Sequence, residues 1–178
     1  METYWIETCV SSLLEEDHHE NRMHWAQQIL TTPYPVEDLL GLFYMEPKAA
    51  QRLCWLLGDL CTLKPGCLDP IVTLLFTMVH TPPFPEYRRT VAKVFIYHGI
   101  PEPIQGPAVD FLWNLVADPK VPPQTKGYAL EALSPILRSH LALQEEMRLT
   151  IEVQWDHVST SFKKTVRRLY PNWLFHSC

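Results

Sequence analysis

An internal repeat of 37 residues constrains the fold of this chain more than any other sequence feature. Basic residues recur at this spacing at four positions: Arg52, Arg89, Lys126 and Lys163. The surrounding columns stay in register without gaps, and one of them holds Leu75, Leu112 and Leu149. A fixed period of this length is typical of repeat proteins, in which each unit buries its apolar face only against its neighbours. We therefore expect a stack of similar structural units.

Within a unit, the pattern predicts two short helices separated by prolines. Residues 70–80 are almost wholly apolar. The prolines that follow should end this helix, because proline lacks an N–H and has a fixed φ. Residues 86–97 place apolar and charged side chains at helical spacing. Gly99 is a candidate for a left-handed C-cap, and the next unit repeats the plan over 107–117 and 125–137.

The plan extends in both directions along the chain. The last pair is predicted over 141–153 and 161–169, with Ser159 or Thr160 as N-cap. Pro135 lies inside a predicted helix and should kink or shorten it. No alternation typical of strands is found. The sequence thus predicts one all-α domain over 1–178, which comprises a divergent capping pair (1–31), four repeats of about 37 residues (32–170, beginning with helices over 36–44 and 49–60) and a tail (171–178).

The pattern resembles the HEAT family of helical repeats over residues 32–170. The shared features are an apolar first helix, the turn Asp118-Pro119, and a basic residue early in the second helix followed by small and apolar positions. The resemblance implies a right-handed α–α superhelix, a HEAT/ARM-like solenoid of about five helical hairpins. It also implies a hydrogen bond between the turn aspartate and the basic residue, which only Asp118 and Lys126 could form here.

Composition and cysteine usage narrow the class of protein. Hydrophobic residues make up 47% and charged residues 20%, as in folded proteins. No run approaches the roughly 18 apolar residues of a membrane span, and Glu2 and Glu7 occupy the region where a signal peptide would be cationic. The five cysteines are odd in number and lie mostly in apolar stretches. We expect reduced core thiols in a cytoplasmic protein.

The candidate chemical motifs do not point to catalysis. His18, His19 and His24 with Glu20 are the densest ligand-like cluster. A zinc protease needs two histidines at i and i+4 on one helix face, whereas His19 and His24 are five apart, so we expect solvated or packing histidines and no metal. No nucleophile elbow, phosphate loop or dinucleotide fingerprint occurs. We therefore expect no cofactor and a non-catalytic protein, with an enzyme assembled from distant units as the alternative.

Charge is distributed unevenly along the chain, whose formal net charge is −5. Residues 1–46 hold nine acidic residues and one basic residue, a net charge of −8, whereas residues 161–178 hold four basic and no acidic residues. Such polarity permits weak head-to-tail contact between copies. The candidate partner-binding residues are the repeated cations Arg52, Arg89, Lys126 and Lys163 together with Lys164, Arg167, Arg168, Trp155 and Trp173.

Two interpretations of the repeated cations remain open. They could make intramolecular salt bridges and caps, or they could line a groove for an anionic partner. Trp55 and Trp113 are expected in the core, and Trp155 and Trp173 on the surface. The predicted function is a protein–protein interaction or scaffold module for a peptide or partner protein. The alternatives are a HEAT-like enzyme of the DNA glycosylase type, which the net charge disfavours, and a regulatory subunit of an enzyme.

Overall fold

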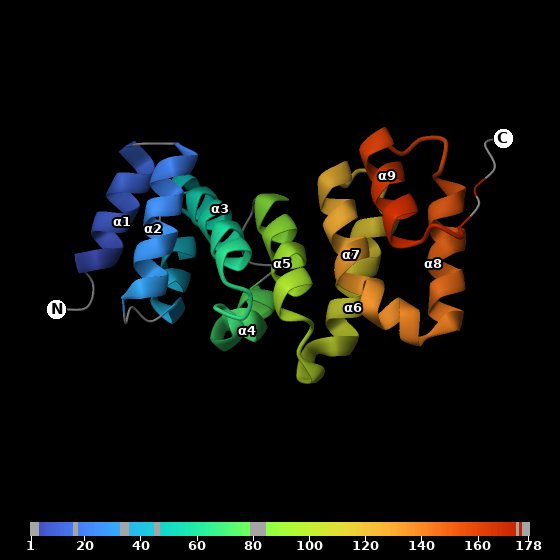
Figure 1. Cartoon of the computed structure of the whole chain (residues 1–178), viewed down its shortest axis with the longest axis horizontal. Coiled ribbons are helices and arrows are strands. Elements are labelled where there is room, and N and C mark those ends of the chain that lie inside the picture. The colour runs from blue at the N-terminus through green and yellow to red at the C-terminus, as the bar shows by residue number, and fades with distance from the viewer. Residues whose placement is uncertain are drawn as a thin grey trace. The chain divides into compact units, whose positions relative to one another are not determined.

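The computed structural model describes residues 4–15, 18–32, 36–44, 47–78, 85–173 and 175. Every regular element among them is helical, which confirms the predicted all-α class (Figure 1). No helix in these ranges is both long and apolar enough to cross a membrane. The chain divides into two compact units, Met1–Gly99 and Ile100–Cys178. The single-domain organisation and the superhelix remain predictions.

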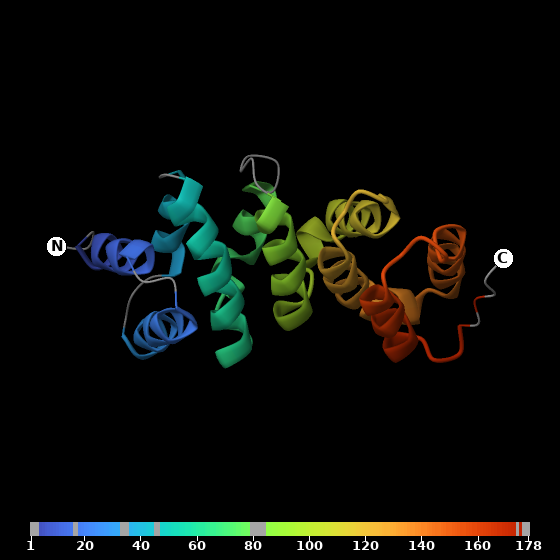
Figure 2. The ribbon, with the colours of Figure 1, turned by 90° about the horizontal axis from the view of Figure 1, so that it is seen from above.

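The N-terminal unit consists of successive helix pairs, and we call the first helix of each pair a first-layer helix and the second a second-layer helix. Its elements are α1 (Tyr4–Glu15), α2 (His19–Thr31), the 3₁₀ helix η1 (Val36–Tyr44), α3 (Pro47–Leu63), the 3₁₀ turn η2 (Asp69–Ile71), α4 (Val72–Thr77) and α5 (Pro85–His98). The helices α2, α3 and α5 pack in sequence, with α3 in the middle (Figure 1, Figure 2). The core of the unit is the leucine-rich face of α3, where Leu53, Leu56 and Leu57 are fully buried.

The C-terminal unit repeats the plan with two helix pairs. Its elements are the 3₁₀ turn η4 (Glu102–Ile104), α6 (Gln105–Ala117), α7 (Pro123–Ser139), α8 (Leu141–Val153) and α9 (Thr160–Leu169). The second-layer helices α7 and α9 pack against each other. Leu112, Leu133 and Val166 are fully buried in its core.

Contacts between neighbouring helices span one repeat length in both units. Arg22 Nε lies 3.1 Å from Asp59 Oδ2, 37 residues away. In the C-terminal unit, Arg168 donates two hydrogen bonds to Glu131, again 37 residues away. Residues that lie 37 positions apart on successive helices therefore contact each other in each unit.

Several predicted helix boundaries are confirmed. Gly99 ends α5 with a φ of 74°, and its N–H donates to Phe95 O at 3.0 Å. Ser159 is the N-cap of α9, where its side chain accepts a hydrogen bond from Phe162 N at 3.2 Å. Pro82 and Pro83, two of the prolines expected to end the helix over 70–80, lie outside the described residues, as does Cys178.

One helix differs from its predicted form, and another excludes one of two predicted effects. Pro135 does not shorten α7, which continues to Ser139, and the kink at Pro135 stays a prediction. Residues 36–44 form a 3₁₀ helix instead of an α-helix. Gly41 lies in the middle of that segment, and glycine weakens an α-helix because it loses the most backbone entropy there.

Candidate interaction surface

The helix α9 separates apolar and cationic side chains more cleanly than its neighbours. Phe162 and Val166 point inward and are 1% and 0% exposed, in contact with α7. Lys164, Arg167 and Arg168 lie on the exposed side. The last two also lie in the final helical turn, where positive charge interacts favourably with the helix dipole. We call the exposed side of α9, with Lys163, Lys164, Arg167 and Arg168, the basic face.

The positive charge of the basic face is only partly neutralised. Arg168 forms a bidentate ion pair with Glu131, with N–O distances of 3.2 and 2.8 Å. Lys164 and Arg167 have no carboxylate within 4.0 Å among the described residues. Nearby, the exposed Arg138 donates to a backbone carbonyl, Leu169 O, and not to an acid. The face therefore retains uncompensated charge for a partner.

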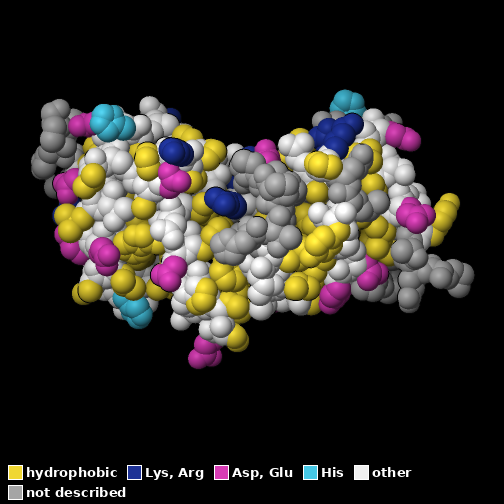
Figure 3. Space-filling model, turned by 180° about the vertical axis from the view of Figure 1, so that it is seen from behind, with side chains coloured by type: hydrophobic (Ala, Val, Ile, Leu, Met, Phe, Trp, Pro, Cys, Tyr) yellow, Lys and Arg dark blue, Asp and Glu magenta, His cyan; other side chains and the backbone are white. Residues whose placement is uncertain are grey.

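Several acidic side chains of the C-terminal unit, other than Glu131, lie on α6 and α8. Asp110 on α6 and Glu145 and Glu146 on α8 are exposed. The rear view of this unit shows acidic groups and few cations (Figure 3). On α8, Arg148 is held between Glu145 and Glu152 and adds no free charge. The cations of this unit are thus concentrated on α9.

Trp155 lies beneath the basic face, which corrects the predicted surface position. Its ring is 4% exposed, because the turn between α8 and α9 brings it under α9. Lys163 Nζ lies 5.2 Å and Arg167 Cζ 5.6 Å from the ring centroid, within the range of cation–π attraction. Phe175 stacks on the same ring with centroids 4.2 Å apart. This packing positions two of the cations of the basic face.

The other tryptophans occupy intermediate positions. Trp173 is half-buried and stacks on Tyr170, with centroids 4.0 Å apart and an interplanar angle of 6°. Trp55 and Trp113, which were expected in the core, are also half-buried. Trp173 is therefore the tryptophan of the predicted site that keeps an accessible edge beside the basic face.

The structure separates the four repeated cations into different environments. Arg52 and Lys126 are buried, at 8% and 3% exposure, whereas Arg89 and Lys163 are half-buried. The Arg52 guanidinium lies 4.5 Å over the ring of Trp55. Burial of Arg52 and Lys126 favours the intramolecular role over the open groove for these two residues, because their side chains do not form part of an exposed surface.

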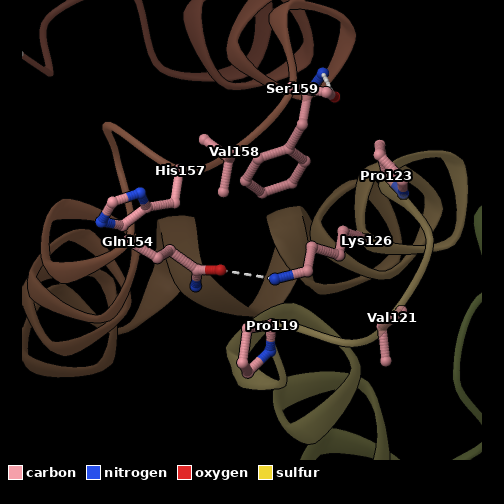
Figure 4. A pocket seen from close by; sticks show the side chains of 9 residues that line it. Pro119, Val121, Pro123, Lys126, Gln154, His157, Val158 and Ser159 are labelled. Atoms are coloured by element: carbon pink, nitrogen blue, oxygen red, sulfur yellow. Dashed lines mark hydrogen bonds between the residues drawn. The ribbon is translucent and has the colours of Figure 1, made fainter.

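Lys126 forms part of a small pocket between the two turns of the C-terminal unit. Its Nζ donates to Val116 O at 3.1 Å. It also donates to Gln154 Oε1 (Figure 4). Asp118 does not accept the hydrogen bond that the HEAT resemblance implies, since Asp118 Oδ1 caps its own turn through Lys120 N at 2.8 Å. Burial lowers the pKa of Lys126 from its ordinary value of 10.5.

A Cys–His–Asp arrangement in the N-terminal unit was not predicted. Cys61 Sγ lies 3.5 Å from His98 Nε2, and His98 Nδ1 lies 2.6 Å from Asp69 Oδ1. This is the order of groups in a thiol-based catalytic triad. The 37-residue spacing of Cys61 and His98 was the available sequence signal, because equivalent positions of neighbouring helices face each other.

Because the thiol and the imidazole are buried, this arrangement stabilises the fold and does not act in catalysis. Cys61 and the His98 side chain are both 0% exposed. Burial raises the pKa of the Cys61 thiol to about 12, so the nucleophilic thiolate is not formed near neutral pH. Reactive cysteines lie in partly exposed, electropositive sites. The Asp69 side chain is 66% exposed, whereas the thiol and the imidazole that would carry the chemistry are closed to a substrate. The triad therefore acts as a connection between α3, η2 and α5.

The remaining candidates behave as packing or solvated groups. His18, His19 and His24 are all exposed. Cys9, Cys54 and Cys61 are buried and Cys67 half-buried, all as free thiols, as predicted for core cysteines.

Neither protein-family models, nor curated proteins, nor solved structures give a match to the chain.

Proposed function

We propose that this protein is a non-catalytic interaction module that binds an acidic segment of a partner protein on the basic face of α9. The observation that carries the proposal is the uncompensated charge of Lys164 and Arg167. An acidic segment would restore the missing counter-charge, and Trp173 offers an aromatic edge of the kind enriched in protein interfaces.

We further propose that the helix pairs of each unit are stacked as HEAT-like repeats. The contacts at one repeat length, Cys61 with His98 and Glu131 with Arg168, support this architecture. In such proteins each pair buries its apolar face against its neighbours and leaves a second-layer helix surface accessible. The four free cysteines are consistent with a reducing compartment, and we propose the cytoplasm.

The test compares charge reversal on α9 with the same reversal in the other unit. The probe is a fluorescent peptide that alternates glutamate pairs with leucine, and binding is measured by anisotropy at low and physiological salt. The double variant Lys164→Glu with Arg167→Glu should weaken binding at least about tenfold, since each lost close charge pair is worth about 1 kcal/mol or more. The melting temperature should fall modestly, because Arg167→Glu removes the cation–π contact with Trp155 and places a negative charge in the last turn of α9. Binding is therefore compared at a temperature at which both proteins are folded.

The matched control is Lys64→Glu with Arg88→Glu, which changes the net charge equally at two exposed cations of the N-terminal unit. Equal weakening in both double variants would show a diffuse charge effect and contradict the proposal. A single-stranded oligonucleotide of equal charge is the competing ligand. If it binds α9 more tightly than the peptide, with the steep salt dependence of phosphate contacts, the partner is a nucleic acid and the proposal is wrong.

A further inference from the structure

The ammonium of Lys126 is a buried cation with an incomplete set of partners. Its side chain is 3% exposed and donates to two neutral oxygens, Val116 O and Gln154 Oε1. An ammonium has three N–H donors, so one donor has no protein acceptor among the described residues. None of the described carboxylates lies within 4.0 Å of Nζ. A buried charge of this kind is costly unless it is paired.

The surrounding groups hold Lys126 in this position. Gln154 Nε2 donates to Val116 O at 3.1 Å and to Thr150 O at 3.3 Å, so the amide oxygen of Gln154 is directed toward the ammonium. The two acceptors of Lys126 come from the end of α6 and the α8–α9 turn. The cation is thus fixed before any ligand arrives, which lowers the entropy cost of binding.

A cavity of about 110 Å³ opens beside this ammonium. Most of its wall is apolar and comes from Pro119, Val121, Pro123, Val158 and Phe162 (Figure 4). At about 30 Å³ for each water, the cavity has room for about four waters or for a ligand of a few heavy atoms. The pocket therefore combines one fixed positive charge with a short apolar wall.

We propose that this pocket binds a carboxylate carried on a short aliphatic chain, with Lys126 as its counter-ion. The carboxylate accepts the unused N–H of Lys126, and the aliphatic chain lies against the prolines, Val158 and Phe162. A phosphate group fits less well, because its several oxygens require several donors and have no use for an apolar wall. This inference concerns a different site from the basic face and does not depend on it.

The experiment titrates the full-length protein with sodium butyrate and records side-chain and backbone NMR signals. Saturable shifts are expected at Lys126, Gln154, Val158 and Phe162, with a Kd of about 1 mM, as suits a ligand of this size. Butyramide has the same shape without the charge, so it should bind at least about tenfold more weakly. Inorganic phosphate should also bind more weakly than butyrate.

The decisive variant is Lys126→Met, which replaces the cation with an apolar side chain of similar length. It should weaken butyrate binding about tenfold or more and remove the preference over butyramide. The matched control is Lys120→Met, an exposed lysine of the same turn that does not line the pocket. It should bind butyrate as the natural protein does. If Lys126→Met does not fold, Val158→Trp, which fills the cavity, serves as the second variant and should abolish binding.

The outcomes decide the proposal directly. Absence of saturable shifts, equal binding of butyramide, or unchanged binding in the folded variants would overturn it. Two peptides then identify the source of the carboxylate: an acetylated, amidated tripeptide with one glutamate, and an acetylated alanine tripeptide with a free C-terminus. Tighter binding of either peptide than of butyrate assigns the site to an acidic side chain or a chain terminus, and tighter binding of butyrate assigns it to a free acid.

Discussion

At the scale of single residues, two lysines at equivalent positions of the repeat make different contacts. Lys126 and Lys163 occupy equivalent positions of the 37-residue repeat. Lys126 is buried against Val116 O, whereas Lys163 is half-buried over the ring of Trp155. The period therefore predicts where a side chain lies on its helix. What it contacts depends on the neighbouring turn, which the period does not specify.

The buried Lys126 predicts a pH dependence of stability. Burial lowers its pKa in the folded protein below the ordinary value of 10.5, so the unfolded chain binds this proton more tightly. Between the two pKa values the unfolded state holds more protons, and the free energy of unfolding must rise with pH. Each unit of pKa difference corresponds to about 1.4 kcal/mol.

Urea unfolding of the natural protein and of Lys126→Met, from neutral pH to about pH 10.5, measures this contribution. The natural protein should gain stability relative to the variant as pH rises above the lowered pKa, and the gain should still be increasing at 10.5, where half of the unfolded chains keep this proton. Lys120→Met should follow the natural protein. Parallel curves for the natural protein and Lys126→Met would show that the two states bind this proton equally.

At the scale of elements, helix ends were more predictable than burial. The helix over 141–153 was predicted correctly, and the N-cap of α9 is Ser159, one of the two predicted candidates, because capping chemistry is local. The burial of Trp155 was not, because it depends on how the α8–α9 turn packs under α9. The pairing of Cys61 with His98 also needs two helices to be placed in space.

The cap of α9 can be tested by a single substitution. Ser159→Ala removes the acceptor for Phe162 N and should lower the free energy of unfolding by about 1 kcal/mol. Thr160→Ala, at the exposed first position of the same helix, should have a smaller effect. Denaturant titration of both variants compares them. An equal loss in both would mean that intrinsic helix propensity, and not capping, sets the stability of this turn.

At the scale of the whole molecule, a destabilising core substitution in one unit should affect the two units differently. Leu112 is 0% exposed in the C-terminal unit, and Leu112→Ala should cost about 2–5 kcal/mol. In a repeat protein this loss is felt first by neighbouring repeats. Hydrogen exchange should therefore rise in residues 106–139 well before residues 1–31. Simultaneous opening of both segments would contradict the repeat architecture.

The distribution of cysteines allows the opening of the N-terminal unit to be measured through its own thiols. All four described cysteines lie in the N-terminal unit, and the only cysteine of the C-terminal unit is Cys178. Burial raises the pKa of Cys9 and Cys54, as well as that of Cys61, to about 12. Alkylation of these thiols can proceed only when the surrounding helices open. Mass spectrometry of alkylated Cys9, Cys54 and Cys61 would thus time the opening of residues 1–99 in the unmodified chain, without an engineered label.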